Sequence, residues 1–196
     1  MEENPRRFSL QSIKRKHILL AVVIVLCIDI AYIGFSLYQS QAQTKPAQLN
    51  DQEKLRKVFA LYHEYKKNSF AEIDDILPHN IFNFFPPEKV VFVDVRTKTE
   101  QDVSMIPHAI TQDEFENDME PYKNMVIITY CTIGDRSGKY ALTLKGEELR
   151  VYNLIGGILS WVHSGREVHN KGKDVKRVHV FDSSWNLLPA HYQAVQ

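Results

Sequence analysis

Two apolar runs that are rich in β-branched residues place the strongest constraint on the fold of this chain. Residues 89–96 (KVVFVDVR) follow two prolines, and residues 125–130 (MVIITY) follow a polar stretch. Continuous runs of this kind are typical of strands that are buried on both faces of a parallel sheet. Segments with helical spacing separate the runs, and strands that alternate with helices predict an α/β fold with right-handed crossovers.

The other elements follow from capping signals and from periodicity. Asn50 predicts the start of an amphipathic helix over 51–67, whose apolar residues recur at helical spacing. Capping boxes at Ser69 and at Thr111 each predict the start of a further short helix. Additional helices are expected over 137–149 and 158–164, and additional strands over 151–154 and 178–181.

The amino-terminal region divides by composition into a basic tail over 1–17, an apolar segment over 18–38 and a polar linker over 39–49. The apolar segment has the length, roughly 20 residues, that a helix needs to cross a bilayer. Its one charged residue, Asp29, would cost about 3 kcal/mol near the bilayer centre. Because the tail is basic, we expect it to lie in the cytoplasm. The sequence thus predicts a single-pass transmembrane anchor, with the rest of the chain exocytoplasmic, in a periplasm or outside the cell.

A cleaved secretory signal is the alternative interpretation of the same segment. Residues 18–28 alone would serve as its hydrophobic core, and residues 40–42 (SQA) form a weak cleavage site that ends at Ala42. The protein would then be secreted. The apolar stretch continues past Asp29 to Tyr38, which favours the uncleaved anchor.

Composition argues against several classes of function. The chain has 24 Lys and Arg against 24 Asp and Glu, so no basic field for binding nucleic acid is expected. Its two cysteines, Cys27 and Cys131, lie in the apolar segment and after a predicted strand, which leaves no disulfide framework. Its eight histidines are scattered without metal-ligand spacing, and we therefore expect no metal site.

Cys131 is the residue of the chain best placed for chemistry. It follows the strand predicted over 125–130, and a short turn and a helix start come after it. The backbone N–H groups of such a turn, and the positive end of a helix, favour negative charge and can convert a cysteine into a nucleophile. Asp94 and Arg96 end the other strand, at the edge where open α/β sheets place their binding crevices. We expect these two residues to give the site structural support.

Four sequence elements, taken together in this order, resemble the rhodanese (sulfurtransferase) superfamily. They are DVRTKTE at residues 94–100, IPHAI at 106–110, CTIGDRS at 131–137 and LIGGILSW at 154–161. Two departures stand out, because Ser104-Met105 replaces the family's Gly-His and His108 replaces a glycine. The resemblance implies a rhodanese-like domain over 69–168, preceded by the amphipathic helix within 50–68. The extension over 169–196 is expected to pack on that domain.

The resemblance implies an enzyme that carries sulfur on Cys131. Cys131 would take the outer sulfur of a small donor, thiosulfate or a persulfide, and hold it as a persulfide. The acceptor of that sulfur would then be cyanide or a thiol, and the thiol could belong to a protein. Neither a metal nor an organic cofactor is implied.

The resemblance also assigns roles within the active loop, which comprises Thr132, Ile133, Gly134, Asp135, Arg136 and Ser137. Backbone N–H groups of this loop would point at the terminal sulfur of the persulfide, and Gly134 would adopt a positive φ. Arg136 would attract an anionic donor, and the Ser137 hydroxyl would cap the helix or bond the sulfur. Asp135 places a negative charge beside Arg136, so thiosulfate is not expected to be the physiological donor.

Two other functions stay open. Phosphatases of this fold have a C-x5-R loop that is wide enough for phosphate, whereas four residues separate Cys131 from Arg136. The shorter loop favours sulfur transfer over a phosphatase or an arsenate reductase. Rhodanese domains also serve as non-catalytic docking or regulatory modules, and a membrane tether would suit such a module. The presence of Cys131 favours the enzyme.

Overall fold

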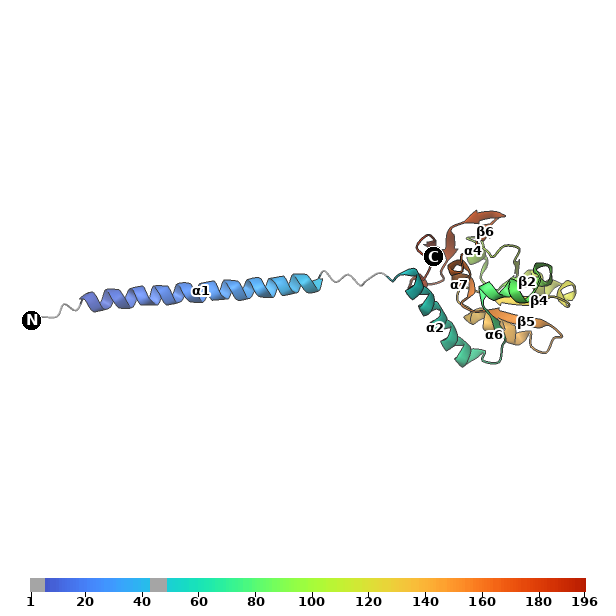
Figure 1. Ribbon diagram of the computed structural model, residues 1–196, viewed down its shortest axis with the longest axis horizontal. Helices are drawn as coiled ribbons and strands as arrows, with labels where there is room; N and C mark the ends of the chain where they lie inside the picture. The colour runs from blue at the N-terminus through green and yellow to red at the C-terminus, as the bar shows by residue number, and fades with distance from the viewer. Residues whose placement is uncertain (1–5, 43–48) are drawn as a thin grey trace, which may run out of the picture. The chain divides into compact units, whose positions relative to one another are not determined.

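The structure, a computed structural model, describes residues 6–42 and 49–196, with side chains in the first stretch described at 17, 18, 20 and 22–37. The chain forms two compact units, Met1–Gln48 and Leu49–Gln196, and each unit is described by itself (Figure 1). Predictions that fall on residues 1–5 and 43–48, which include most of the linker, lie outside the described residues.

The described residues of the first unit, 6–42, form the helix α1 Arg6–Ala42. This helix extends beyond the apolar segment 18–38 on both sides, and no proline or glycine interrupts the chain between Arg6 and Ile33. Across the residues whose side chains are described, no helix has the length and apolar character needed to cross a membrane, so the predicted anchor over 18–38 is not supported. The predicted orientation, and the alternative of cleavage near Ala42, stay predictions.

A five-stranded parallel sheet forms the centre of the second unit, in the order β1-β5-β4-β2-β3. The two apolar runs form β2 Val90–Asp94 and β4 Val126–Tyr130, which lie side by side with Val91 opposite Ile127. Both strands are largely buried, which is why their sequences are continuous apolar runs. The prediction of an α/β fold with a parallel sheet is confirmed. The other strands are β5 Arg150–Leu154, between β4 and β1, and the two edge strands β1 Asp75–Ile76 and β3 Ile110–Thr111.

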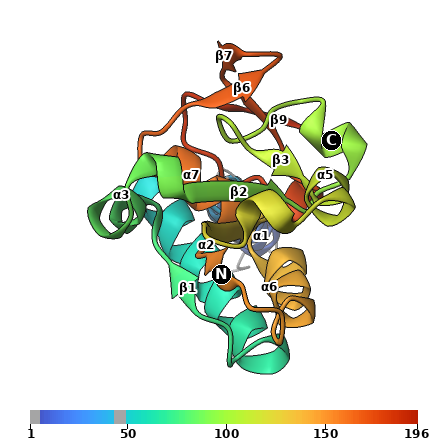
Figure 2. The ribbon, with the colours of Figure 1, turned by 90° about the vertical axis from the view of Figure 1, so that its right-hand side faces the viewer.

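Helices cover both faces of this sheet (Figures 1 and 2). On one face, α5 Gln112–Asn117 and α6 Asp135–Thr143 bury Phe115 and Tyr140 against β2 and β4. On the other face, α7 Gly157–His163 and α3 Ile81–Phe84 contribute to the larger core. The short remaining helices are α4 Lys98–Gln101 and four 3-10 helices, Pro78–Asn80, Pro87–Lys89, Glu120–Tyr122 and Ser183–Trp185.

The predicted amphipathic helix is α2 Asp51–Ser69, which begins at a capping box formed by Asn50 and Glu53. In both ribbon views α2 lies beside α6, and it also contacts α7 (Figures 1 and 2). Its Val58 and Tyr62 are fully buried. The helix therefore packs directly behind the segment that carries Cys131.

Three predicted elements differ from the structure. Ser69 opens no new helix, because it is the last residue of α2, and residues 75–76 instead pair with β5 as the strand β1. The helix predicted over 137–149 begins two residues earlier, at Asp135, and ends at Thr143, before Gly146. The strand predicted over 178–181 is β8 Arg177–His179. By contrast, the capping box at Thr111 opens α5 as predicted.

His108 takes over the backbone conformation of the glycine that it replaces. Its φ is 61°, in the left-handed region. Histidine is among the few non-glycine residues that are enriched there. The turn before β3 is therefore formed without the glycine that the family pattern places in it.

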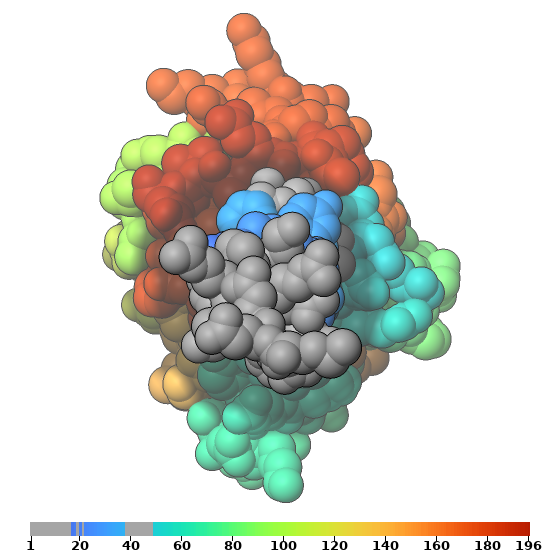
Figure 3. All heavy atoms as spheres, turned by 90° about the vertical axis from the view of Figure 1, so that its left-hand side faces the viewer, coloured from blue at the N-terminus to red at the C-terminus, as the bar shows by residue number. Residues whose placement is uncertain are grey.

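The C-terminal segment, residues 166–196, adds two small sheets to this unit. β6 Val168–Asn170 and β7 Lys173–Val175 form a hairpin, and β8 pairs in parallel with β9 Gln193–Val195. Figure 3 shows that this segment, in orange to red, forms part of the surface of the unit. Its inward side chains join the same core as α7, namely Val168, Val178, Val180, Leu187, Leu188 and Tyr192.

Candidate active site

Cys131 lies between the end of β4 and the start of α6. Gly134, with φ 104°, reverses the chain so that its own backbone N–H donates a hydrogen bond to Cys131 Sγ at 3.1 Å. The Cys131 side chain is almost fully buried, at 1 % exposure. A backbone N–H and the positive end of α6 both stabilise negative charge on this sulfur. The loop therefore places the Gly134 N–H and the start of α6 beside Cys131 Sγ.

Gly134 is required at this turn for two reasons. Its positive φ is unfavourable for other residues, as predicted from the sequence. A Cβ atom at this position would also lie 2.6 Å from ring carbons of Tyr62 and 3.3 Å from the carbonyl oxygen of Leu154. The Tyr62 ring of α2 thus packs directly on the turn that presents the N–H to the sulfur.

A buried hydrogen-bond network connects the active loop to β5 and α2. Asn153 of β5 donates from Nδ2 to the carbonyl oxygen of Gly134 at 2.9 Å and to the Tyr62 hydroxyl at 3.2 Å. Ser137 Oγ donates to Asn153 Oδ1 at 2.7 Å. The Ser137 hydroxyl therefore neither caps α6 nor bonds the sulfur, which were the two roles expected from the sequence.

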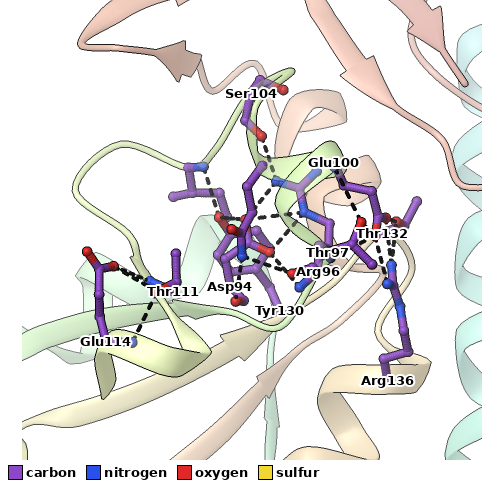
Figure 4. Close-up of polar contacts among 12 residues, drawn as sticks. Asp94, Arg96, Thr97, Glu100, Ser104, Thr111, Glu114, Tyr130, Thr132 and Arg136 are labelled. Carbon is purple, nitrogen blue, oxygen red and sulfur yellow. Dashed lines mark hydrogen bonds and ion pairs between the residues drawn. The ribbon is translucent and has the colours of Figure 1, made fainter. Parts of the chain in front are cut away.

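Arg136 is already paired within the protein. Its Nη1 and Nη2 donate to the two carboxylate oxygens of Glu100 at 2.8 and 2.7 Å, and Nη2 also reaches Thr132 Oγ1 at 3.2 Å (Figure 4). Thr132 Oγ1 in turn donates to Glu100 at 3.0 Å. Glu100 is 2 % exposed, whereas the Arg136 side chain is 30 % exposed. The guanidinium expected to attract an anionic donor is therefore neutralised by a buried carboxylate.

The pKa values of this pair agree with full ionisation of both groups. Burial alone would raise the pKa of Glu100, but hydrogen bonds from Arg136 and from the Thr97 backbone N–H lower it to about 2. Burial alone would lower the pKa of Arg136, but the Glu100 hydrogen bond and the nearby Cys131 raise it above its ordinary value. The carboxylate and the guanidinium thus stay charged together across the physiological range.

Asp135, which was expected to offset Arg136, pairs with another residue. Its Oδ2 accepts from Lys139 Nζ at 2.8 Å, one turn further along α6. The negative partner of Arg136 is Glu100 instead, because the Thr97 capping box turns that carboxylate toward the loop. The carboxylate that contacts Arg136 is therefore Glu100, whereas the sequence had pointed to Asp135.

Asp94 and Arg96 form a buried support beside the loop. Arg96 donates from Nε and Nη2 to the Asp94 carboxylate at 2.9 and 2.7 Å, and Tyr130 Oη donates to Asp94 Oδ2 at 2.7 Å. Arg96 Nη2 also binds the carbonyl oxygen of Ser104 at 2.6 Å. Tyr130 directly precedes Cys131, so this cluster fixes the end of β4 (Figure 4).

Sequence reasoning missed several residues that contact the loop. Glu100 carried a usable signal, since Thr97-x-x-Glu100 is a capping box. Asn153 carried a weaker signal, as a polar residue between Tyr152 and Leu154 at the buried end of β5. Tyr62 and Phe181 reach the loop only through tertiary packing, and nothing local in the sequence marks them. Within the described part of the chain, no group of three or more His, Cys, Asp or Glu side chains could hold a metal ion.

Comparison with known protein families finds a match for residues 85–164. These residues match the family described as Rhodanese-like domain. No curated protein matches the chain. The family match supports assignment of this part of the chain to the rhodanese-like family, and a central parallel sheet flanked by helices fits the rhodanese fold.

Several solved structures are similar to the chain. A protein of Bacillus halodurans is 28% identical, with a TM-score of 0.43, and the match covers 57% of this chain and 84% of that one. A thiosulfate sulfurtransferase of Pseudomonas aeruginosa is 18% identical, with a TM-score of 0.46, over 58% of this chain and 23% of that one. A protein of unknown function from Rhodopseudomonas palustris, described as a possible tyrosine phosphatase, is 23% identical, with a TM-score of 0.41, over 57% and 93%.

Proposed function

We propose that this protein is a sulfurtransferase in which Cys131 accepts a sulfane sulfur from a donor and passes it to a thiol. The observation that carries the proposal is the hydrogen bond from the Gly134 N–H to Cys131 Sγ, at 3.1 Å. It is made inside a loop that has four residues between Cys131 and Arg136. Backbone donors of this kind stabilise a sulfur anion without providing the space of a phosphate pocket.

The reaction needs two displacements at sulfur. In the first, the Cys131 thiolate attacks the terminal sulfur of a persulfide or of thiosulfate. The bond between Cys131 Sγ and that sulfur forms while the donor's own S–S or S–SO3 bond breaks, and the electron pair leaves with a thiolate or sulfite. In the second displacement, an acceptor thiolate or cyanide removes the sulfur and regenerates Cys131. Both steps exchange one sulfur bond for another and require no oxidant.

Two alternatives compete with this proposal. The burial of Cys131 favours a non-catalytic docking or regulatory module, since such a module needs no accessible sulfur. A phosphatase or an arsenate reductase has less support, because the loop is short and the Arg136 guanidinium is held by Glu100. Direct measurement of sulfur uptake separates these functions.

The test uses the full chain and intact-protein mass spectrometry. After exposure to thiosulfate or to glutathione persulfide, the protein should gain one sulfur atom, which cyanide should remove. A Cys131→Ser variant should gain none, whereas Cys27→Ser, which alters the other cysteine, should behave like the wild type. Failure of the wild type to take up sulfur from either donor would exclude sulfur transfer. Turnover of a phosphate ester or of arsenate in its place would establish the third function.

A further inference from the structure

Phe181, in the C-terminal segment, has an unusual backbone conformation for a phenylalanine. Its φ is 64°, and the Asp182 N–H donates to the carbonyl oxygen of Val180 at 2.7 Å, which closes a three-residue turn around it. Turns of this form with positive φ are rare and strained, the more so with a bulky residue at the centre. The Phe181 side chain is nevertheless 55% exposed, so burial of its ring does not explain the conformation. Such strain is a reason to look for a functional contact.

The ring of Phe181 makes that contact with the active loop. The guanidinium carbon of Arg136 lies 5.1 Å from the centroid of the ring, within the range of a cation–π interaction. The ring also packs on Trp185, with 5.4 Å between the centroids. The N–H of Phe181 is also bonded to His179 Nδ1 at 3.1 Å, which fixes the turn. An aromatic side chain from outside residues 85–164 is thereby held against Arg136.

The charged groups around the loop compensate one another. Arg136 has the Glu100 carboxylate along its edge and the Phe181 ring near it, and Asp135 pairs with Lys139. These four ionised side chains carry two positive and two negative charges. A dianion such as thiosulfate therefore meets no uncompensated positive charge among them, whereas the exposed part of the Phe181 ring offers an apolar contact.

We infer that Phe181 is a specificity-determining residue, which gives the Cys131 site an aromatic contact for the carbon-containing part of an organic sulfane-sulfur donor and so favours such donors over inorganic thiosulfate. The inference rests on the proposed sulfur transfer and names its donor class. With an organic thiosulfonate, R–SO2–S⁻, the Cys131 thiolate takes the terminal sulfur, and the S–S bond breaks to release the sulfinate R–SO2⁻. With an organic persulfide the same step releases the thiolate R–S⁻.

The test compares two donors that carry the same reacting sulfur. Benzenethiosulfonate differs from thiosulfate by a phenyl group in place of one charged oxygen. The second-order rate constant of sulfur uptake on Cys131 is measured with each donor on the full chain. Phe181→Gly removes the ring and suits the positive φ, so this variant should fold. We expect the benzenethiosulfonate-to-thiosulfate ratio to fall by about tenfold, the size of effect that a lost apolar contact has on specificity.

Each variant is compared with the wild type by its benzenethiosulfonate-to-thiosulfate ratio of rate constants. The intrinsic reactivity of the two donors cancels in this comparison, because it is the same for every variant. Phe181→Tyr keeps an aromatic ring and should retain the wild-type ratio. Phe84→Ala, which truncates another exposed phenylalanine, on α3, should leave the ratio unchanged. An unaltered ratio in Phe181→Gly, with sulfur uptake intact, would overturn the role of Phe181 and leave the proposed function standing. Absence of uptake from both donors in the wild type would instead overturn the proposed function, and the inference with it.

Discussion

At the scale of single residues, the contact between Glu100 and Arg136 determines the electrostatics of the loop. Glu100 makes hydrogen bonds to the Thr97 N–H, to Thr132 Oγ1 and to both terminal nitrogens of Arg136. A carboxylate with so many donors is stabilised in its charged form although it is buried. The same contacts orient Arg136 and engage both of its terminal nitrogens. Glu100 is therefore expected to contribute to stability, and the proposed sulfur transfer would make it a determinant of donor choice as well.

Replacement of Glu100 by Gln should destabilise the protein in a pH-dependent way. Folding lowers the pKa of Glu100 from 4.5 to about 2, so its contribution is present above about pH 4.5 and is lost as the pH falls through about 2. At pH 7 we expect Glu100→Gln to lower the free energy of unfolding by roughly 2 kcal/mol. Urea denaturation from pH 7 to pH 2 should show that the difference from the wild type closes between these two pKa values.

A surface carboxylate provides the matched control for this experiment. Asp102 pairs with Lys98, and both side chains are mostly exposed. Asp102→Asn should change the free energy of unfolding by less than about 1 kcal/mol at any of these pH values, because water screens exposed pairs. Equal effects of the two substitutions would contradict a special contribution of the buried pair.

At the scale of elements, the active loop is positioned by α7, the helix that follows β5. The first N–H groups of α7 donate to the loop, from Ile158 to the carbonyl oxygen of Cys131 at 2.9 Å and from Leu159 to that of Thr132 at 3.3 Å. Gly157 allows the start of α7 to lie this close to the active loop. A Cβ there would lie 2.3 Å from the carbonyl oxygen of Cys131, and the φ of Gly157 is 55°. The Gly156-Gly157 turn is therefore part of the construction of the Cys131 site.

Gly157→Ala should be strongly destabilising and should slow sulfur uptake. The added methyl group would displace the carbonyl groups of Cys131 and Thr132, and we expect the free energy of unfolding to fall by more than about 3 kcal/mol. Gly172→Ala is the control, because Gly172 has φ 74° but no heavy atom near its would-be Cβ. That variant should lose only about 1 to 2 kcal/mol, the cost of the left-handed conformation. Denaturation of both variants measures the difference, and similar losses would show that sterics at Gly157 have no effect.

Elements with strong local signals were predictable from the sequence, and those set by tertiary pairing were not. β2 and β4 are long apolar runs, and α2 and α5 have capping residues, so each is marked within its own residues. β1 and β3 have two residues each and exist only through pairing with β5 and β2. For the same reason the position of Cys131 followed from its strand, whereas the contacts of Asn153 and Phe181 required the folded chain.

At the scale of the second unit, residues outside the matched region enclose the larger core. The C-terminal segment is tied to α2 by two hydrogen bonds, from Lys54 Nζ to the carbonyl oxygen of Leu188 and from the Ala190 N–H to Asp51 Oδ1, both at 2.9 Å. His163 at the end of α7 also bonds the carbonyl oxygen of Leu187 at 2.7 Å. The same segment carries Phe181 to the active loop. One stretch of chain therefore contributes both to the core and to the contact that we propose for the donor.

Leu188→Ala should test whether this segment is integral to the folded unit. Leu188 is 2 % exposed and lies in the core shared with α7, so its truncation should lower the free energy of unfolding by about 2 to 4 kcal/mol. Leu49→Ala is the control, because Leu49 is 40 % exposed and should change stability by less than about 1 kcal/mol. A single cooperative transition, shifted to lower denaturant, is expected in Leu188→Ala. Separate unfolding of residues 166–196, with the rest of the unit unaffected, would show that the segment is an appendage, and the Phe181 contact would then vary independently of the fold.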